Sequence, residues 1–280
     1  MKNYLGALLL GASLIPLGIV HAANDYADIF VDYSQGSGTS STFNVPSVAL
    51  GAPISGTDGS TPYSIVYPAY KNTQIVGVGN GGFLKLGFST PITNDPVNHA
   101  FGMDFTIFGN EFFSPPSSIT GAFGHAGLSV WVSQDNVTYY QLAVPNGYGA
   151  DDWLPTQGSG NPLQPVDPAF TISSFVGLNQ AQALSLYNGS AGGASFSLGW
   201  AQDGGGNPVN LSSISYIEIQ GTSGAGYVDS IARVQTVPEP GSALFLSAGM
   251  GVVLLRRWQR ARPKKRKTSA PFANNPPLNS

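Results

Sequence analysis

Three histidines and no cysteine limit the nucleophilic chemistry open to this chain. The histidines are His21, His99 and His125, and the sequence contains neither a Gly-x-Ser-x-Gly nor a His-Glu-x-x-His motif. His99 and His125 lie in loop-like stretches flanked by Asn and Gly, which is typical of solvated positions. A serine triad would need a distant serine that no local pattern indicates. We therefore expect a protein that is not an enzyme.

Carboxylates offer a second kind of chemistry, because hydrolysis of a glycosidic bond needs two facing carboxyl groups. Glu111, Asp104, Glu218 and Asp229 are available, but no spacing pairs them. A secreted carbohydrate-active hydrolase is therefore kept only as an alternative.

Aromatic side chains are candidates for sugar binding, since flat apolar rings beside polar donors suit a saccharide. Trp153 follows Asp151 and Asp152 in a long stretch rich in Gly, Pro, Asn and Asp, residues 145–206, and is expected to be exposed there. Core packing is the competing interpretation for the other rings, because large aromatics are usually buried. These are Trp131, Trp200, Tyr139, Tyr140 and Tyr187.

Alternation of apolar and polar residues recurs through the middle of the chain and predicts β-strands. Leu84, Leu86 and Phe88 share one strand face, and Phe105 and Ile107 share another. The expected strands cover residues 27–33, 83–88, 101–108, 128–133, 137–142, 214–219 and 227–234, with a weak helix near 178–187. The glycine-rich residues 77–82 and 203–206 are expected to be turns, since neither has the Lys-Ser/Thr of a nucleotide loop.

The charges are distributed very unevenly. Fourteen of the 15 acidic residues but only three of the 12 basic residues lie between Asn24 and Val237, which gives this part a formal charge of −11. An acidic domain argues against nucleic acid as a partner, because phosphate recognition needs basic patches. The absence of cysteine excludes disulfides, so stability is expected from the sheet core, with a calcium ion as an alternative aid.

The first residues predict export. Lys2 is followed by an apolar run to Val20, and Ala22 provides a small residue for cleavage. A charged start, a short apolar run and a small-residue site are the parts of a secretory signal peptide, here residues 1–22. The expected partners are the Sec translocon and signal peptidase.

The last residues predict sorting to the cell surface. Val237, Pro238, Glu239 and Pro240 precede an uncharged apolar segment, residues 241–255, and then Arg256 and Arg257 open a strongly basic cluster. Basic residues beside a membrane span stay cytoplasmic, so everything before Pro238 is expected outside. This tail, residues 238–262, resembles the PEP-CTERM sorting domain of Gram-negative bacteria. The resemblance implies cleavage near Pro-Glu-Pro by an exosortase-type membrane protease and an association with exopolysaccharide. Residues 263–280 depart from the family pattern and are expected to be disordered.

The strands from about residue 80 to 235 resemble a group of bacterial cell-surface β-sandwich proteins. The resemblance rests on residues 82–92, 104–112 and 128–140, followed by a closing strand pair at 216–231. It implies a jelly-roll or galactose-binding-like sandwich, and it places four oxygen-bearing side chains near one another, those of Asp104, Asn110, Glu111 and Asp229. Such oxygen ligands suit calcium, although turn-forming Asp and Asn residues show the same pattern.

The sequence therefore predicts an all-β chain with one β-sandwich ectodomain, residues 23–237, between a signal peptide and a sorting tail with one transmembrane helix. The expected function is that of a non-enzymatic surface or matrix protein that interacts with extracellular polysaccharide. A hydrolase and a calcium-dependent glycan-binding module are the alternatives. Fold alone does not decide between them.

Overall fold

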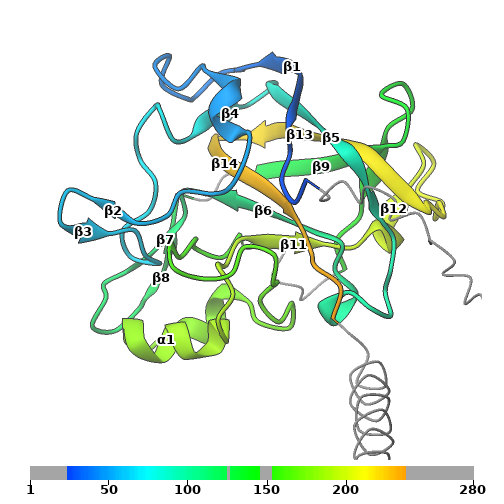
Figure 1. The fold of residues 1–280 in the computed structure, drawn as a ribbon. Coiled ribbons are helices and arrows are strands. Elements are labelled where there is room, and N and C mark those ends of the chain that lie inside the picture. The colour runs from blue at the N-terminus through cyan, green and yellow to red at the C-terminus, as the bar shows by residue number, and fades with distance from the viewer. Residues whose placement is uncertain (1–23, 125–126, 146–152, 238–280) are drawn as a thin grey trace, which may run out of the picture. The chain divides into compact units, whose positions relative to one another are not determined.

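A computed structural model describes residues 24–124, 127–145 and 153–237 of the chain (Figure 1). Contacts divide the chain into two units, residues 1–236 and 237–280, and all strands and helices given below lie in the first. The described part is all-β with one short α-helix, as the alternation predicted. Among the described residues, no helix is both long and apolar enough to cross a bilayer. The expected signal peptide, transmembrane segment and sorting residues Pro238 to Arg257 lie outside the described residues.

Two antiparallel sheets contain most of the strands. The six-stranded sheet has the order β1 (Ile29–Ser34), β5 (Phe83–Thr93), β13 (Ser213–Ser223), β9 (Gly127–Ser133), β10 (Tyr140–Leu142) and β12 (Ala201–Gln202). The four-stranded sheet has the order β11 (Ala194–Phe196), β6 (Phe105–Gly109), β14 (Ala225–Arg233) and β4 (Val76–Gly79). Two small hairpins pair β2 (Thr57–Asp58) with β3 (Thr61–Pro62) and β7 (Phe112–Ser114) with β8 (Gly121–Phe123).

Short helical segments connect these strands. The one α-helix is α1 (Gln180–Tyr187), and Asn179 caps it by accepting a hydrogen bond from the Gln182 N–H at 3.0 Å. This cap agrees with the preference of helix N-termini for Asn. The 3-10 helices are η1 (Pro46–Ala49), η2 (Ala100–Gly102), η4 (Ile172–Phe175) and η5 (Leu198–Trp200).

One hydrophobic core contains side chains from both sheets. Leu84, Leu86 and Phe88 of β5 are buried in it, as their spacing predicted. Phe105 and Ile107 enter the same core from β6, whereas Phe108 points to a separate cluster with Ala191. Because each strand buries alternate residues, the opposite face of the six-stranded sheet is left for polar and aromatic side chains.

The two sheets approach each other closely at a glycine corner, which the sequence predicted to be only a turn. Gly77 and Gly79 belong to β4, and the chain then turns through residues 80–82 into β5. Gly221 of β13 lies against this corner: its N–H donates to Gly82 O, and its own carbonyl accepts from the Gly81 N–H, both at 2.9 Å. A Cβ at Gly221 would lie 2.0 Å from Gly79 O, so only glycine fits.

The described part of the 145–206 stretch contains regular structure, unlike the expected loop excursion. Residues 153–206 add β11 to one sheet and β12 to the other. Phe196, Leu198 and Ala201 pack into the shared core. The stretch is therefore part of the fold's interior as well as a connection on its surface.

Candidate functional site

The outer face of the six-stranded sheet gathers charged, amide and aromatic side chains on three neighbouring strands. Glu218 of β13 lies opposite Lys85 of β5 on one side and Trp131 of β9 on the other. The next cross-strand row places Gln220 between Phe83 and Ser129. Since residues two apart share a strand face, these rows form one surface.

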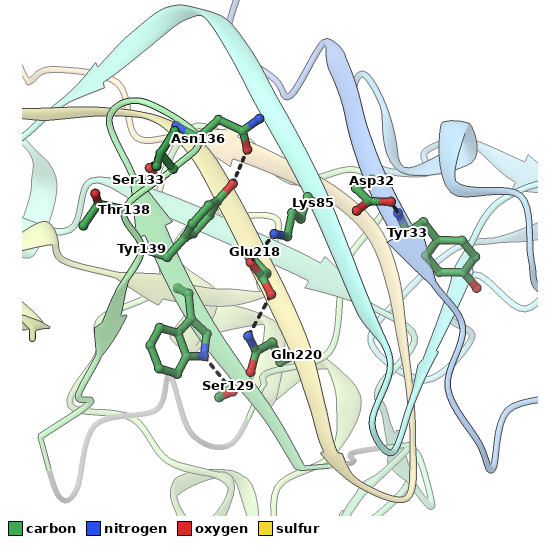
Figure 2. Close-up of polar contacts among 12 residues, drawn as sticks. Asp32, Tyr33, Lys85, Ser129, Ser133, Asn136, Thr138, Tyr139, Glu218 and Gln220 are labelled. Carbon is green, nitrogen blue, oxygen red and sulfur yellow. Dashed lines mark hydrogen bonds and ion pairs between the residues drawn. The ribbon is translucent and has the colours of Figure 1, made fainter. Parts of the chain in front are cut away.

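Ion pairing and hydrogen bonds satisfy the charges on this face. Lys85 Nζ lies 3.0 Å from Glu218 Oε2, and Gln220 Nε2 donates to Glu218 Oε1 at 2.7 Å (Figure 2). Lys85 Nζ also lies 4.7 Å from the ring centroid of Tyr139 and 5.4 Å from that of Phe83. Cation–π contacts of this length hold the ammonium group against the rings. The face is thus polar, and the charges of Lys85 and Glu218 compensate each other.

A tight turn before β10 holds Tyr139 over this network (Figure 2). Asp135 Oδ1 accepts from the N–H groups of Val137 and Thr138, both at 2.9 Å, and these donors hold the pKa of Asp135 below its usual value. Asn136 takes a left-handed conformation with φ of 61°. Asn tolerates that region better than most residues, so it suits this position of the turn.

Tyr139 stays a hydrogen-bond donor at physiological pH. Burial, followed by the nearby Glu218 and Tyr216, raises the pKa of Tyr139 to about 12. Its hydroxyl donates to Asn136 Oδ1 at 2.6 Å. The hydrogen bond of the hydroxyl and the contact of Lys85 with the ring therefore hold Tyr139 in place before any ligand binds.

Trp131 presents a half-buried indole on the same face. Its Nε1–H donates to Ser129 Oγ at 3.2 Å, and its cross-strand neighbours are Glu218 and the exposed Gln141. The sequence left open whether Trp131 faces the core or the outside. The register now places it outside, opposite the buried Val130 and Val132. Pre-oriented rings beside amides and hydroxyls can stack on a sugar's C–H face and hydrogen-bond its hydroxyls.

The expectation of an exposed Trp153 is wrong. Only 2% of Trp153 is exposed, and its indole packs edge-on against Phe196 at 6.4 Å in the shared core. Tyr187 is also buried, with its hydroxyl donating to Pro155 O at 2.8 Å. Asp151 and Asp152 lie outside the described residues. The signal that could have found the outer face was the alternation of residues 214–219, which puts Tyr216 and Glu218 opposite Ile217.

The four residues expected around a calcium ion are not brought together. Asp104 precedes β6, whereas Asn110 and Glu111 follow the end of that strand, and Asp229 lies at a β-bulge of β14 beside Gly109. Among the described residues, no three His, Cys, Asp or Glu side chains are placed to hold one metal ion. Asp104 lies at the start of β6, whereas the other three residues lie near the end of that strand. These four side chains therefore do not form one shared ligand set.

Glu111 and Asn110 nevertheless carry buried oxygens without hydrogen-bond partners. Both carboxylate oxygens of Glu111 and Oδ1 of Asn110 are buried and unpaired. Burial raises the pKa of Glu111 from its usual 4.5 to about 8, so the carboxyl group holds a proton at neutral pH. Burial likewise raises the pKa of Asp229 to about 7, although the Ile54 N–H donates to it at 2.8 Å. Calcium takes about six to eight oxygen ligands, so the oxygens of Glu111 and Asn110 alone do not make a complete site for that ion.

His99 is not a solvated loop residue, contrary to the sequence-based expectation. It is 6% exposed, and its Nδ1 lies 2.8 Å from Asp104 Oδ1. Asp104 also accepts from the Leu198 N–H at 2.7 Å and the Asp95 N–H at 3.1 Å. The pair therefore joins the His99 loop to the residue that precedes β6.

The 145–206 stretch contains two pockets that the hydrolase alternative would need. Among the described residues that line them, Asp167 is the only carboxylate, so the described linings contain no facing carboxyl pair of the kind that glycoside hydrolysis requires. No protein-family model matches the chain and no curated protein matches it, so known sequences identify neither the sorting tail nor the cell-surface family.

Proposed function

We propose that this protein is an exported, non-enzymatic surface or matrix protein that binds extracellular polysaccharide through the outer face of its six-stranded sheet. The observation that carries the proposal is the fixed aromatic and amide surface formed by Phe83, Trp131, Tyr139 and Gln220 around the Lys85–Glu218 pair. A broad face of this kind suits the interior of a polymer chain, since several sugar units can lie across neighbouring strands.

The electrostatics of the face favour a neutral polymer. Lys85 and Glu218 neutralise each other, so neither is free to pair with a charged sugar. The whole region from Asn24 to Val237 has a formal charge of −11 and would repel a polyanion at low salt. Nucleic acid is therefore not proposed as a partner.

Export and sorting belong to the same proposal. The signal peptide at residues 1–22 would deliver the domain through the Sec translocon, and an exosortase-type protease would act near Pro238–Pro240. The two sheets and their shared core support a β-sandwich of the jelly-roll type for residues 23–237. Matrix attachment is the role that joins an exported acidic domain with a sugar-binding face.

Replacing Trp131 by alanine tests the binding face. Affinity electrophoresis through dextran, galactomannan, xylan and the producing organism's own exopolysaccharide would measure retardation of the 23–237 domain. Loss of one stacked ring is expected to weaken binding about 10-fold, which corresponds to about 1.4 kcal/mol. Val137→Ala is the matched control, because Val137 is 82% exposed in the neighbouring turn. Binding by W131A equal to that of the native protein, or no binding by the native protein, would refute the proposal.

A further inference from the structure

One of the two pockets lies away from the sheet face, between η2 and the end of α1. Its volume is about 240 Å³, and its lining includes Phe101, Gln164, Asp167, Phe170, Ser185 and Asn188. Phe108, Ala191 and Leu163 pack on the face of the four-stranded sheet opposite the shared core, so this part of the chain covers the far side from Trp131. In Figure 1, α1 likewise lies beyond β6 and β11 when viewed from β9 and β13.

Phe101 reaches this pocket through an unusual backbone conformation. Its φ is 56° and its ψ is 14°, in the left-handed region that a bulky residue rarely occupies. The cost of such a conformation is about 1–3 kcal/mol, so the surrounding contacts must enforce it. The Gly102 N–H donates to His99 O at 3.0 Å, and the His99–Asp104 pair fixes the same loop. The loop thus holds the Phe101 ring at the pocket, 54% exposed, in a backbone conformation that lowers the stability of the fold.

Polar groups around the pocket are held in place and retain hydrogen-bonding capacity. Gln164 Nε2 donates to Asn188 O at 2.9 Å, and the amide oxygen of Gln164 has no hydrogen-bond partner among the described residues. Asp167 Oδ1 accepts from the Ala169 N–H at 2.9 Å, and Oδ2 has no hydrogen-bond partner among the described residues. The lining thus combines three aromatic residues, two amides and one carboxylate, which are the kinds of group that recognise a hydroxyl-rich ring.

We propose that this pocket binds a single terminal hexose unit that carries no negative charge. Its volume is below the ~300–1,000 Å³ of pockets for drug-sized ligands, so one sugar ring fits better than an extended chain. Asp167 accepts from a hydroxyl or an ammonium group and repels a uronic acid. The pocket therefore recognises chain ends, whereas the sheet face recognises chain interiors. This assignment goes beyond the proposed function, since it rests on different residues and makes one domain bivalent.

Saturation-transfer NMR with methyl glucoside, methyl galactoside, methyl mannoside, glucosamine and glucuronic acid tests the pocket. At least one neutral hexoside or glucosamine is expected to bind saturably, with glucuronic acid at least about 10-fold weaker. Phe101→Ala is expected to weaken this binding about 10-fold. Val97→Ala in the same loop, where Val97 is 82% exposed and outside the lining, is expected to leave it unchanged. Absence of binding by all five sugars, or equal binding by F101A, would overturn the proposal.

Two further variants separate the possible failures. Asp167→Asn keeps the acceptor for the Ala169 N–H but removes the charge, and is expected to reduce only the preference for glucosamine over methyl glucoside. Trp131→Ala is expected to lose polymer binding while keeping sugar binding in the pocket. If F101A also lost its thermal transition, the intact D167N and W131A proteins would still decide the question. A W131A protein that lost both activities would contradict the independence of the two sites.

Discussion

Glu111 places an ionisable carboxyl group in the interior with no hydrogen-bond donor to receive its charge. Its folded-state pKa of about 8 is above the usual 4.5, so the folded protein holds a proton that the unfolded chain releases. The contribution of Glu111 to stability is therefore greatest below about pH 4.5 and falls as pH rises to about 8, by about 1.4 kcal/mol per pKa unit. Asp229 contributes a similar fall that ends near pH 7.

Glu111→Gln is expected to remove the part of this fall that Glu111 causes, because an amide of similar shape cannot ionise. Urea unfolding between pH 5 and pH 9 would measure it. Between pH 7 and pH 8 the native protein should still lose stability, while E111Q should stay nearly constant. The same titration in calcium chloride and in EGTA gives the control. If calcium stabilised only the native protein at pH 8, Glu111 would act as an ionised calcium ligand instead.

Asp104 is a second buried acid, but three donors surround it. Its oxygens accept from the Leu198 and Asp95 N–H groups and lie beside His99 Nδ1. Asp104→Ala would leave these groups without a partner, and the free energy of unfolding is expected to fall by about 3 kcal/mol. Asp203→Ala, in an exposed turn, is the comparison and should cost about 1 kcal/mol or less. Equal effects in urea titrations would contradict the importance of this network.

The sequence could not reveal this network because its members meet only in the folded chain. His99 has the neighbours of a loop residue, and nothing local shows that the start of β6 covers it. The position of Trp153 was predicted wrongly for the same reason. Its Gly- and Pro-rich stretch is typical of an exposed loop, but β11 pairs within a sheet and Trp153 packs in the core. Trp131 and Glu218 were within reach, because their strands alternate regularly.

At the scale of elements, the lack of a side chain at Gly221 allows β13 of one sheet to approach β4 of the other. Gly221→Ala would push a Cβ to 2.0 Å from Gly79 O, and backbone atoms cannot yield as a flexible side chain would. The expected loss is about 3 kcal/mol in the free energy of unfolding. Gly204→Ala is the matched control, since nothing lies within 4 Å of its added Cβ, and it should change stability by less than about 0.5 kcal/mol. Denaturant midpoints that shift equally would refute the close approach.

Elements with strong alternation were predicted correctly, and those built from small residues were missed. The strands β5, β9, β13 and β14 lie where the pattern placed them, with extended bounds. β4 was interpreted as a turn because four of the six residues in the 77–82 run are glycines, which show no side-chain period. β4 is a strand because it pairs with β14, and the residues of β4 alone do not reveal this pairing.

At the scale of the whole molecule, hydrogen bonds join the first described residues to the last strand, β14. The Arg233 N–H donates to Asp25 O at 2.9 Å, and Tyr26 bridges Ala232, so the described ends of the domain pair with each other. Among the described residues after Val234, the Gln235 N–H donates to Leu163 O and Thr236 bridges His99. Cleavage after Ala22 and near Pro240 would therefore leave every described sheet pairing intact.

This placement leads to a prediction about the exported protein. Its intact mass is expected to match a chain that starts at Ala23 and ends near Pro240, and a recombinant 23–240 protein should melt at the same temperature as this mature form. A recombinant 23–232 protein is the contrasting variant. It loses the Arg233 hydrogen bonds to Asp25 O and Thr90 O and the pairing of Thr236 with His99, so its melting temperature should be several degrees lower. An exported protein that retains Ser280 would contradict processing, whereas an unchanged melting temperature for the 23–232 protein would show that the terminal pairings contribute nothing to the domain.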